Sequence, residues 1–481
     1  MDGCALWVGF QPQPWPYASV RCLSPGCYKS AALLKSLEIS AQPDSPASCP
    51  RGLDREGWGI DAAVCFISSW PRNAAPWPDR GRGVSSFAFR VSERRGEVGD
   101  VQHPLAEPIE PVDAMVIDVS GKTLMPGLID AHAHITGLNL SPRNISYPAS
   151  EIVLACSNCL QNSLMDGFTT IREAGGADHS IAQLLAKGTI VGPRLFYSGQ
   201  ALTQTGGGAD FRTPGELIDP CGHVSPFSVM SVIADGVDQV RRAAREELRK
   251  GATQIKLFAS GGVVFPSEAH STIYEYSEPE LQAVVEEAKS RGTYVMAHVY
   301  TDEGIRRCLR AGVRSIEHGN FANEETIAMM SEYGAYLDPT FISLVQRIES
   351  ASENNLSQAI VDNLRQTVAR GKQVYKWARQ YDVPLAFGTD LWGPEAQKSQ
   401  LREFEIRMEL DSAPNVIRSA TTTNAALMMQ EGKLGTIAAS AYADLLIVDG
   451  DPLTDLRVML DPQKNLKFIM QDGVIYKNEL N

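Results

Sequence analysis

Short apolar runs alternate with amphipathic stretches through the middle of the chain. The runs that read as strands are Leu128–His134, Phe168–Glu173, Pro193–Ser198, Gln254–Phe258, Tyr294–His298, Ser315–His318, Tyr336–Thr340 and Leu385–Asp390. Eight strands that alternate with helices predict a closed parallel barrel, the (β/α)8 or TIM barrel of the α/β class. In such barrels the chemistry lies at the C-terminal ends of the strands.

Amphipathic stretches with the helical period lie between these runs, among them Gly236–Gly251, Glu278–Arg291, Asp302–Ala311 and Glu324–Tyr333. Pro279 falls in a first helical turn after Ser277, where a missing N–H is tolerated. Several stretches end at a glycine, as at Gly251, Gly292 and Gly312, which is a common helix stop signal. These signals support the alternation of strands and helices.

Short strand-like segments with Gly, Asp and Pro turns lie on both sides of the predicted barrel. We therefore expect a small β-sandwich domain built from both chain ends, residues 112–127 and 430–481. The barrel, residues 128–429, would be inserted between these two parts.

Residues 1–100 differ from the rest of the chain. They show little sustained period of 2 or 3.6 residues, and they are rich in Pro, Cys, Ser, Arg and Gly. They also contain five of the seven tryptophans, Trp7, Trp15, Trp58, Trp70 and Trp77. One interpretation is a poorly ordered extension. The other is a misassigned gene start, so that part of the segment is not native coding sequence.

The composition is that of an ordinary globular protein, with 43% hydrophobic and 21% charged residues among 481. A net charge of −13 argues against nucleic acid or an anionic membrane as the partner. No apolar stretch approaches the roughly 18 residues that cross a bilayer, and the N-terminus lacks the pattern of a signal peptide. As written, the sequence favours a cytoplasmic location; a start elsewhere leaves a secreted or periplasmic origin open.

His132 and His134 are separated by one residue at the end of an apolar run. In a strand, side chains at i and i+2 point to the same face roughly 7 Å apart, so both imidazoles can bind one metal ion. Similar positions in later runs are occupied by Lys256, His298, His318 and Asp390. A single histidine after an apolar run is more often a core residue. The recurrence of ligand types in one context, in a chain with eight histidines, indicates a hydrolytic metal site.

The motifs around these residues resemble the amidohydrolase superfamily over about residues 112–481. The matching segments read PGLIDAHAHI, IKLFASGG, AHVY, IEHG and GTD. Two more, AKGTIVGPR and SGQALTQTGGG, are similar to the branch of dipeptidases and metallo-carboxypeptidases. That branch includes Xaa-Pro dipeptidase-like, imidazolonepropionase-like and ochratoxinase-like proteins. The first hundred residues depart from the family pattern, because they lack recognisable strands of the β-domain.

The resemblance implies two divalent metal ions, with zinc as the expected metal. His132, His134 and Asp390 would hold the more buried ion. His298 and His318 would hold the other ion.

Lys256 would bridge both ions as a carbamate, formed when its amine takes up carbon dioxide. A lysine among metal-site groups loses hydration and lies near cations, so its pKa falls and a neutral amine becomes available. The alternative is an uncarboxylated Lys256, paired with an acid in a mononuclear site.

The expected reaction is amide hydrolysis by a hydroxide that bridges the two ions. Each cation stabilises hydroxide, so the water loses its proton near neutral pH. Asp390 is the expected general base, which later passes the proton to the departing amine. The sequence has no G-x-S-x-G elbow that would indicate a serine hydrolase.

The candidates for substrate binding are Tyr300, Arg172, Trp392 and His270. Tyr300 would hydrogen-bond the α-carboxylate of the substrate, with a packing role as the alternative. Arg172 would bind the same carboxylate or form a structural ion pair. Trp392 would form a wall of the side-chain pocket. His270 lies in residues 261–276, which we expect to form a loop over the site.

We expect a hydrolase that cleaves the amide bond to a C-terminal amino acid in dipeptides or N-acyl amino acids, including ochratoxin-type amides. The alternative within the superfamily is a cyclic amide hydrolase or deaminase, which would favour a mononuclear site. A different class is a catalytically inactive barrel that serves as a scaffold. The expected partner is a small-molecule or dipeptide substrate, and the related proteins suggest a homo-oligomer.

Overall fold

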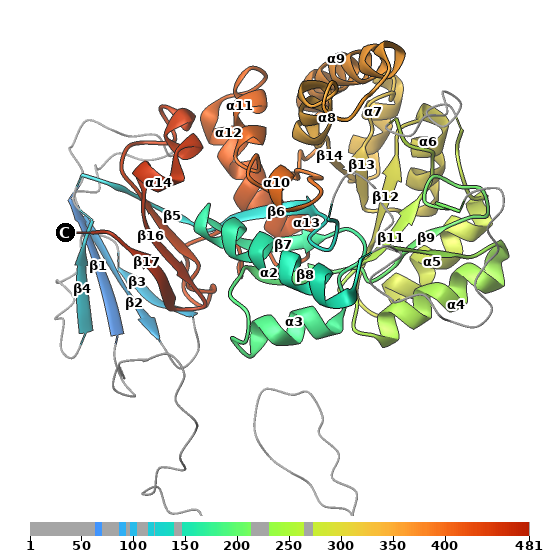
Figure 1. Ribbon diagram of the computed structural model, residues 1–481. Helices are drawn as coiled ribbons and strands as arrows, with labels where there is room; N and C mark the ends of the chain where they lie inside the picture. Colours follow the sequence, from blue (N-terminus) through green and yellow to red (C-terminus); the bar gives the residue numbers. More distant parts are fainter. Residues whose placement is uncertain are drawn as a thin grey trace, which may run out of the picture. The chain divides into compact units, whose positions relative to one another are not determined.

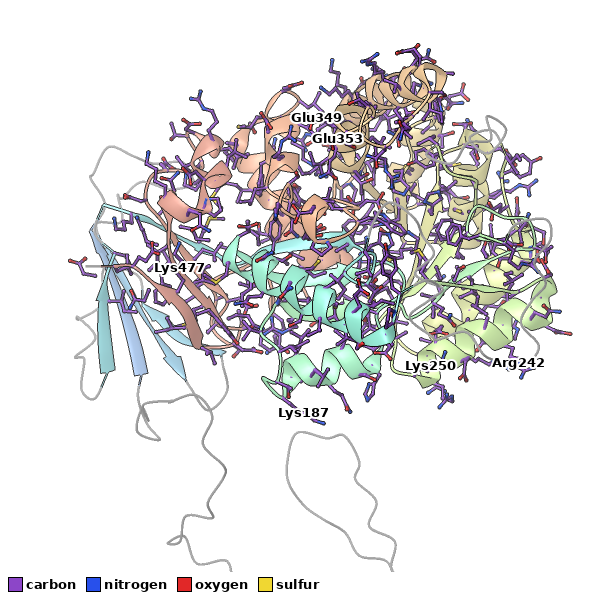
Figure 2. All side chains as sticks on the ribbon, in the orientation of Figure 1. Lys187, Arg242, Lys250, Glu349, Glu353 and Lys477 are labelled. Atoms are coloured by element: carbon purple, nitrogen blue, oxygen red, sulfur yellow. The ribbon has the colours of Figure 1, made fainter. Side chains whose placement is uncertain are left out.

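The computed structural model describes residues 63–69, 86–92, 97–102, 114–119, 121–138, 147–212, 230–263 and 273–480 (Figure 1). Helices and strands alternate along the middle of this chain, as the hydrophobic pattern predicts. Exposed charged side chains such as Lys187, Arg242 and Glu353 project outward from the ribbon (Figure 2). Among the described residues, no helix is long and apolar enough to cross a membrane.

Parallel strands form the centre of the structure. One sheet has the order β6-β7-β8, with β6 (Leu128–Ala133), β7 (Phe168–Glu173) and β8 (Arg194–Tyr197). The other has the order β10-β9-β11-β12-β13-β14. Its strands are β9 (Ala201–Thr203), β10 (Ser231–Ile233), β11 (Ile255–Phe258), β12 (Val295–Val299), β13 (Ser315–His318) and β14 (Tyr336–Asp338). Seven of the eight strand-like runs therefore contain a strand.

Backbone hydrogen bonds connect the two parallel sheets on both sides. Thr253 N donates to Tyr197 O at 2.9 Å, which brings the start of β11 beside the end of β8. On the other side, Ala386 N donates to Leu337 O and Ala131 N donates to Phe387 O, both at 2.8 Å. The segment after Leu385 therefore lies between β14 and β6, in an α/β fold of the TIM-barrel type.

The predicted strand Leu385–Asp390 is not a regular strand in the structure, which has only isolated bridges at Leu385 and Trp392. Side chains are partners of its backbone in addition to the backbone bonds to Leu337, Ala131 and His132. Asn424 accepts from Phe387 N at 3.0 Å and donates to Phe387 O at 2.8 Å. Asp130 accepts from Thr389 N at 3.2 Å. The polar groups of the segment are thus satisfied without a continuous ladder.

Helices follow most of the central strands. The larger ones are α2 (Ala149–Met165), α3 (His179–Ala186), α4 (Gly236–Arg249), α5 (Glu278–Ser290), α6 (Asp302–Ala311), α7 (Glu324–Glu332), α8 (Phe341–Glu349) and α9 (Gln358–Gln380). Ser277 N donates to Glu280 Oε2 at 2.8 Å before α5, and Gly312 ends α6 with a φ of 89°. Buried residues of α5, α6 and α7 join strand residues in one hydrophobic core. The core therefore fixes the strands whose ends carry the candidate ligands.

Shorter helices follow the central strands toward the C-terminus. They are α10 (Pro394–Gln397), α11 (Arg402–Met408), α12 (Ala413–Arg418), α13 (Asn424–Leu427) and α14 (Pro462–Asn465). A π-helical turn at Ser419–Thr423 joins α12 to α13, and a 3-10 turn spans Leu456–Leu460.

Two further sheets contain strands that precede and follow the central strands in the sequence; Figure 1 labels them. The antiparallel sheet β17-β16-β15-β5 combines β5 (Thr123–Pro126) with β15 (Leu445–Val448), β16 (Leu466–Gln471) and β17 (Val474–Asn478). Segments that precede and follow the central strands in the sequence thus share one sheet. The second sheet, β3-β2-β1-β4, consists of β1 (Ala63–Ser69), β2 (Ser86–Ser92), β3 (Glu97–Gln102) and β4 (Ala114–Asp118). The periodicity of the sequence does not predict its first three strands.

Candidate metal centre

His132 and His134 lie at the end of β6 and direct their rings toward Asp390. The Nε2 atoms of His132 and His134 are 3.5 Å and 3.2 Å from Asp390 Oδ1. The two ring centroids are 5.3 Å apart. Asp390 reaches this position with a φ of 56°, and its backbone N donates to His132 O at 2.7 Å. The backbone of β6 therefore helps to hold the carboxylate beside both rings.

The Asp390 carboxylate has partners on both oxygens. The Trp392 indole donates to Oδ1 at 3.2 Å, and the Ser343 hydroxyl donates to Oδ2 at 3.3 Å. Burial opposes ionisation of Asp390, but the neighbouring histidines outweigh it and hold its pKa well below the usual range. Asp390 is therefore a carboxylate at neutral pH.

Lys256 points into the same cluster from β11. Its Nζ lies 3.5 Å from His132 Nε2, and the side chain is 1% exposed. Burial lowers the pKa of Lys256 to about 8, although Glu317 and Asp390 favour the ammonium form. A substantial share of the amine is therefore neutral just above neutral pH.

His298 and His318 complete the cluster from β12 and β13. His318 Nε2 is 3.0 Å from His298 Nδ1, and His318 Nδ1 is 2.6 Å from the Thr340 hydroxyl. The ring centroids of His318 and His132 are 5.3 Å apart. Burial lowers the pKa of His318 to about 3 and that of His132 to about 4, and it also lowers the pKa of His298. Neutral imidazoles are the form that binds metal ions.

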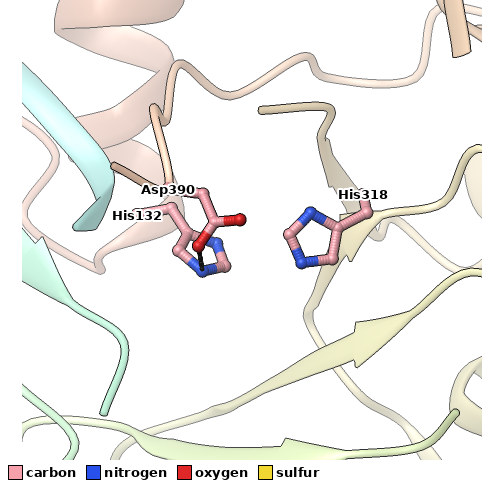
Figure 3. Close-up of side chains that lie close together, drawn as sticks. All are labelled: His132, His318 and Asp390. Atoms are coloured by element: carbon pink, nitrogen blue, oxygen red, sulfur yellow. Dashed lines mark ion pairs between the residues drawn. The ribbon is translucent and has the colours of Figure 1, made fainter. Parts of the chain in front are cut away.

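The donor set fits a divalent metal ion. One ligand atom of each of His132, His318 and Asp390 lies within 4.8 Å of the other two (Figure 3). His298 Nε2 is buried and has no hydrogen-bond partner among the described residues. Imidazole nitrogens with a carboxylate oxygen are typical ligands of zinc. The structure thus brings the six predicted ligand positions into one cluster.

Glu317 is a member of this centre that the sequence analysis misses. Its Oε2 lies 2.7 Å from His132 Nδ1, on the opposite side of the ring from Asp390. A second set of residues that could hold a metal ion, His132 with Glu317 and Asp338, shares His132 with the first set. Such a carboxylate orients a ligand histidine. The only feature of the sequence that could have indicated Glu317 is its position next to His318 in a buried strand.

The sequence-predicted substrate residues occupy different positions. Arg172 is fully buried, and its Nη2 lies 3.1 Å from both carboxylate oxygens of Glu317. This placement favours the structural ion pair. Tyr300 stacks on His318 with ring centroids 4.8 Å apart, and Trp392 packs on His134 at 4.3 Å. Both therefore border the cluster. His270 lies outside the described residues.

Three comparisons relate the chain to known proteins. The profile of the amidohydrolase family matches residues 123–477. Ochratoxinase of Aspergillus niger is 32% identical over 370 residues, which cover 74% of this chain and 75% of the relative.

Two solved structures are similar over most of the chain. The crystal structure of an amidohydrolase has 38% identity and a TM-score of 0.80, and the match covers 87% of this chain and 100% of the other. The crystal structure of a prolidase complexed with N-methylphosphonate-L-proline has 36% identity and a TM-score of 0.78. That match covers 86% of this chain and 100% of the prolidase.

Proposed function

The chain belongs to the amidohydrolase family, and on this basis we propose that it cleaves the amide bond to a C-terminal amino acid in dipeptides or N-acyl amino acids. Family membership confirms the resemblance of the motifs and makes the chain a hydrolase that acts on carbon–nitrogen bonds. The observation that carries the proposal is the convergence of His132, His134 and Asp390 with Lys256 at the strand ends.

The relatives support this substrate class. One is an ochratoxinase, and another is a prolidase complexed with N-methylphosphonate-L-proline, a ligand that keeps the amino-acid part intact. We therefore include ochratoxin-type amides and Xaa-Pro dipeptides among the candidate substrates of this chain.

Two divalent ions, with zinc as the proposed metal, would occupy the centre. His132, His134 and Asp390 would hold one ion, His298 and His318 the other, and Lys256 would join both as a carbamate. When bound, the ions would supply Lewis acidity, which lowers the pKa of water and polarises a carbonyl. The pKa of Lys256, about 8, supports the carbamate because only the neutral amine reacts with carbon dioxide.

Asp390 is the proposed general base. It is ionised and accepts hydrogen bonds from Trp392 and Ser343, which hold its oxygens toward the cluster. It would take the proton of the attacking water and deliver it to the departing amine nitrogen. Amide hydrolysis requires this delivery, because an amide anion is a very poor leaving group.

Tyr300 and Trp392 are proposed to line the substrate site, since both contact the cluster histidines.

We further propose that the central strands close into a (β/α)8 barrel and that residues 112–127 and 430–481 form a small β-sandwich. A homo-oligomer stays a proposal that the family resemblance of the sequence implies.

The test is release of free amino acid from Xaa-Lys, Xaa-Arg, Xaa-Pro and Xaa-Phe dipeptides and from ochratoxin A by zinc-loaded protein. Cleavage that stops on chelation and returns with zinc would support the proposal. If folded protein with two bound ions cleaves none of these substrates, the proposed substrate class is wrong. Cyclic amides would then be tested next.

A further inference from the structure

Arg347 is a buried cation whose side chain has no hydrogen-bond or ion-pair partner among the described residues. It lies in α8 and is only 6% exposed. Within the part of the chain that the structure describes, it forms no hydrogen bond or ion pair. Other buried arginines are paired with acids: Arg172 contacts Glu317 at 3.1 Å, and Arg407 Nε donates to Glu403 at 2.8 Å. A buried, unpaired guanidinium is unusual, because removing a charge from water is costly.

Helix α8 places Arg347 beside the metal centre. Ser343 lies one turn earlier on the same helix and donates to Asp390 Oδ2 at 3.3 Å. Because residues i and i+4 share a helix face, Arg347 lies on the face that contacts Asp390. Among the described residues, Asp390 and Tyr300 are the titratable groups whose charges act on the Arg347 guanidinium. Leu344, between Ser343 and Arg347, packs in one cluster with Tyr300.

Asp390 does not neutralise this guanidinium by direct contact. Its Oδ1 faces His132, His134 and Trp392, and its Oδ2 accepts from Ser343. An anion that enters the site beside Tyr300 could therefore accept hydrogen bonds from the Arg347 guanidinium, whose N–H groups bind no other described residue. The planar guanidinium matches a carboxylate, because two parallel N–H groups can bind its two oxygens.

We propose that Arg347 binds the α-carboxylate of the amino acid that is released, and so makes the enzyme selective for substrates with a free C-terminus. This inference rests on the proposed function and names the group that recognises its substrate class. Arg172 cannot take this role in the structure, because Glu317 already occupies its guanidinium.

The test compares N-acetyl-L-phenylalanine with N-acetyl-L-phenylalaninamide as substrates. Arg347→Gln should lower kcat/KM for the acid about 100-fold, mainly through KM, since a buried charge pair is lost. The loss for the amide should be much smaller. Arg347→Lys should fall between, because it keeps the charge without the bidentate geometry. Arg365→Gln is the matched control: this arginine of α9 is exposed and pairs with Asp362.

Two checks separate recognition from damage to the site. The melting temperature of each variant should not fall below that of the wild type, because the wild-type guanidinium is buried without a charge partner, and the zinc content should equal that of the wild type. If Arg347→Gln does not fold, Arg347→Lys is compared with the wild type in its place. An acid-to-amide preference that is the same in the variants as in the wild type would overturn the inference.

A second measurement keeps the inference independent of the proposed function. Binding of L-phenylalanine and L-phenylalaninamide to zinc-loaded protein is measured by calorimetry. If the wild type hydrolyses none of the dipeptides, ochratoxin A or the two N-acetyl compounds, the proposed function fails, whereas a preference for L-phenylalanine that disappears in Arg347→Gln still supports a carboxylate site. A wild type that does not prefer L-phenylalanine would overturn it.

Discussion

The Oε2 atom of Glu317 lies 2.7 Å from the Nδ1 atom of His132, although 185 sequence positions separate the two residues. Arg172 binds the same carboxylate, so His132, Glu317 and Arg172 form one buried chain of contacts. Burial opposes ionisation of Glu317, but Arg172 and His132 outweigh it and lower its pKa. The carboxylate is therefore ionised and holds the His132 ring with Nε2 toward Asp390.

Glu317→Gln should destabilise the protein and weaken metal binding. It leaves the Arg172 guanidinium buried without its charge partner, which costs about 3–5 kcal/mol. The metal affinity should fall about 10–100-fold, because the orientation of His132 is no longer fixed. Chemical denaturation and zinc titration measure the two effects. Glu405→Gln, at an exposed position of α11, should change neither, and equal behaviour of both variants would refute the role of Glu317.

Asp390→Asn should lower kcat by about 10²–10⁴-fold, because the variant has no general base to take the proton from water and pass it to the departing amine. The measurement is turnover at saturating zinc, with metal content determined in the same sample, because Asp390 is also a proposed ligand. Asp449→Asn provides the control, since this aspartate is exposed and pairs with Lys122 at the surface. Wild-type turnover in Asp390→Asn would exclude the general-base role.

Metal uptake by the metal-free protein should depend on pH and on bicarbonate. The pKa of Lys256 is lowered to about 8, so the ammonium form dominates below that pH and the neutral amine above it. Carbamate formation, and with it zinc uptake, should therefore rise as the pH increases through about 8. A carbamate signal from ¹³C-bicarbonate in the NMR spectrum should be present in the wild type and absent in Lys256→Met. A signal of equal intensity in both would place the carbamate elsewhere.

Chelation should abolish activity and lower the melting temperature, and added zinc should restore both. A metal that binds only the folded state adds stability that depends on its free concentration. Differential scanning fluorimetry over a zinc series checks this dependence. A melting temperature that does not respond to zinc in active protein would contradict a metal centre built from His132, His134 and Asp390.

Much of the architecture follows from local sequence. The alternation of apolar runs and amphipathic stretches predicts the strands β6, β7 and β13 and the helix α6 to within a residue or two. The run Leu385–Asp390 departs from this pattern, because the side chains of Asn424 and Asp130 bind part of its backbone and no continuous strand ladder forms. Such side-chain partners come from distant parts of the chain, so the local hydrophobic periodicity does not predict them.

The sequence by itself determined which residues end the strands, and in a parallel barrel the strand ends meet at one face. That rule predicts that His132, Lys256, His318 and Asp390 gather at one site. Only the tertiary structure decided which residues they contact: Glu317 orients His132, Glu317 also binds Arg172, and Arg347 has no ion-pair partner within the described part of the chain. The physical reason is that strand periodicity fixes the face on which a side chain lies, whereas its contacts depend on neighbours brought close by the fold.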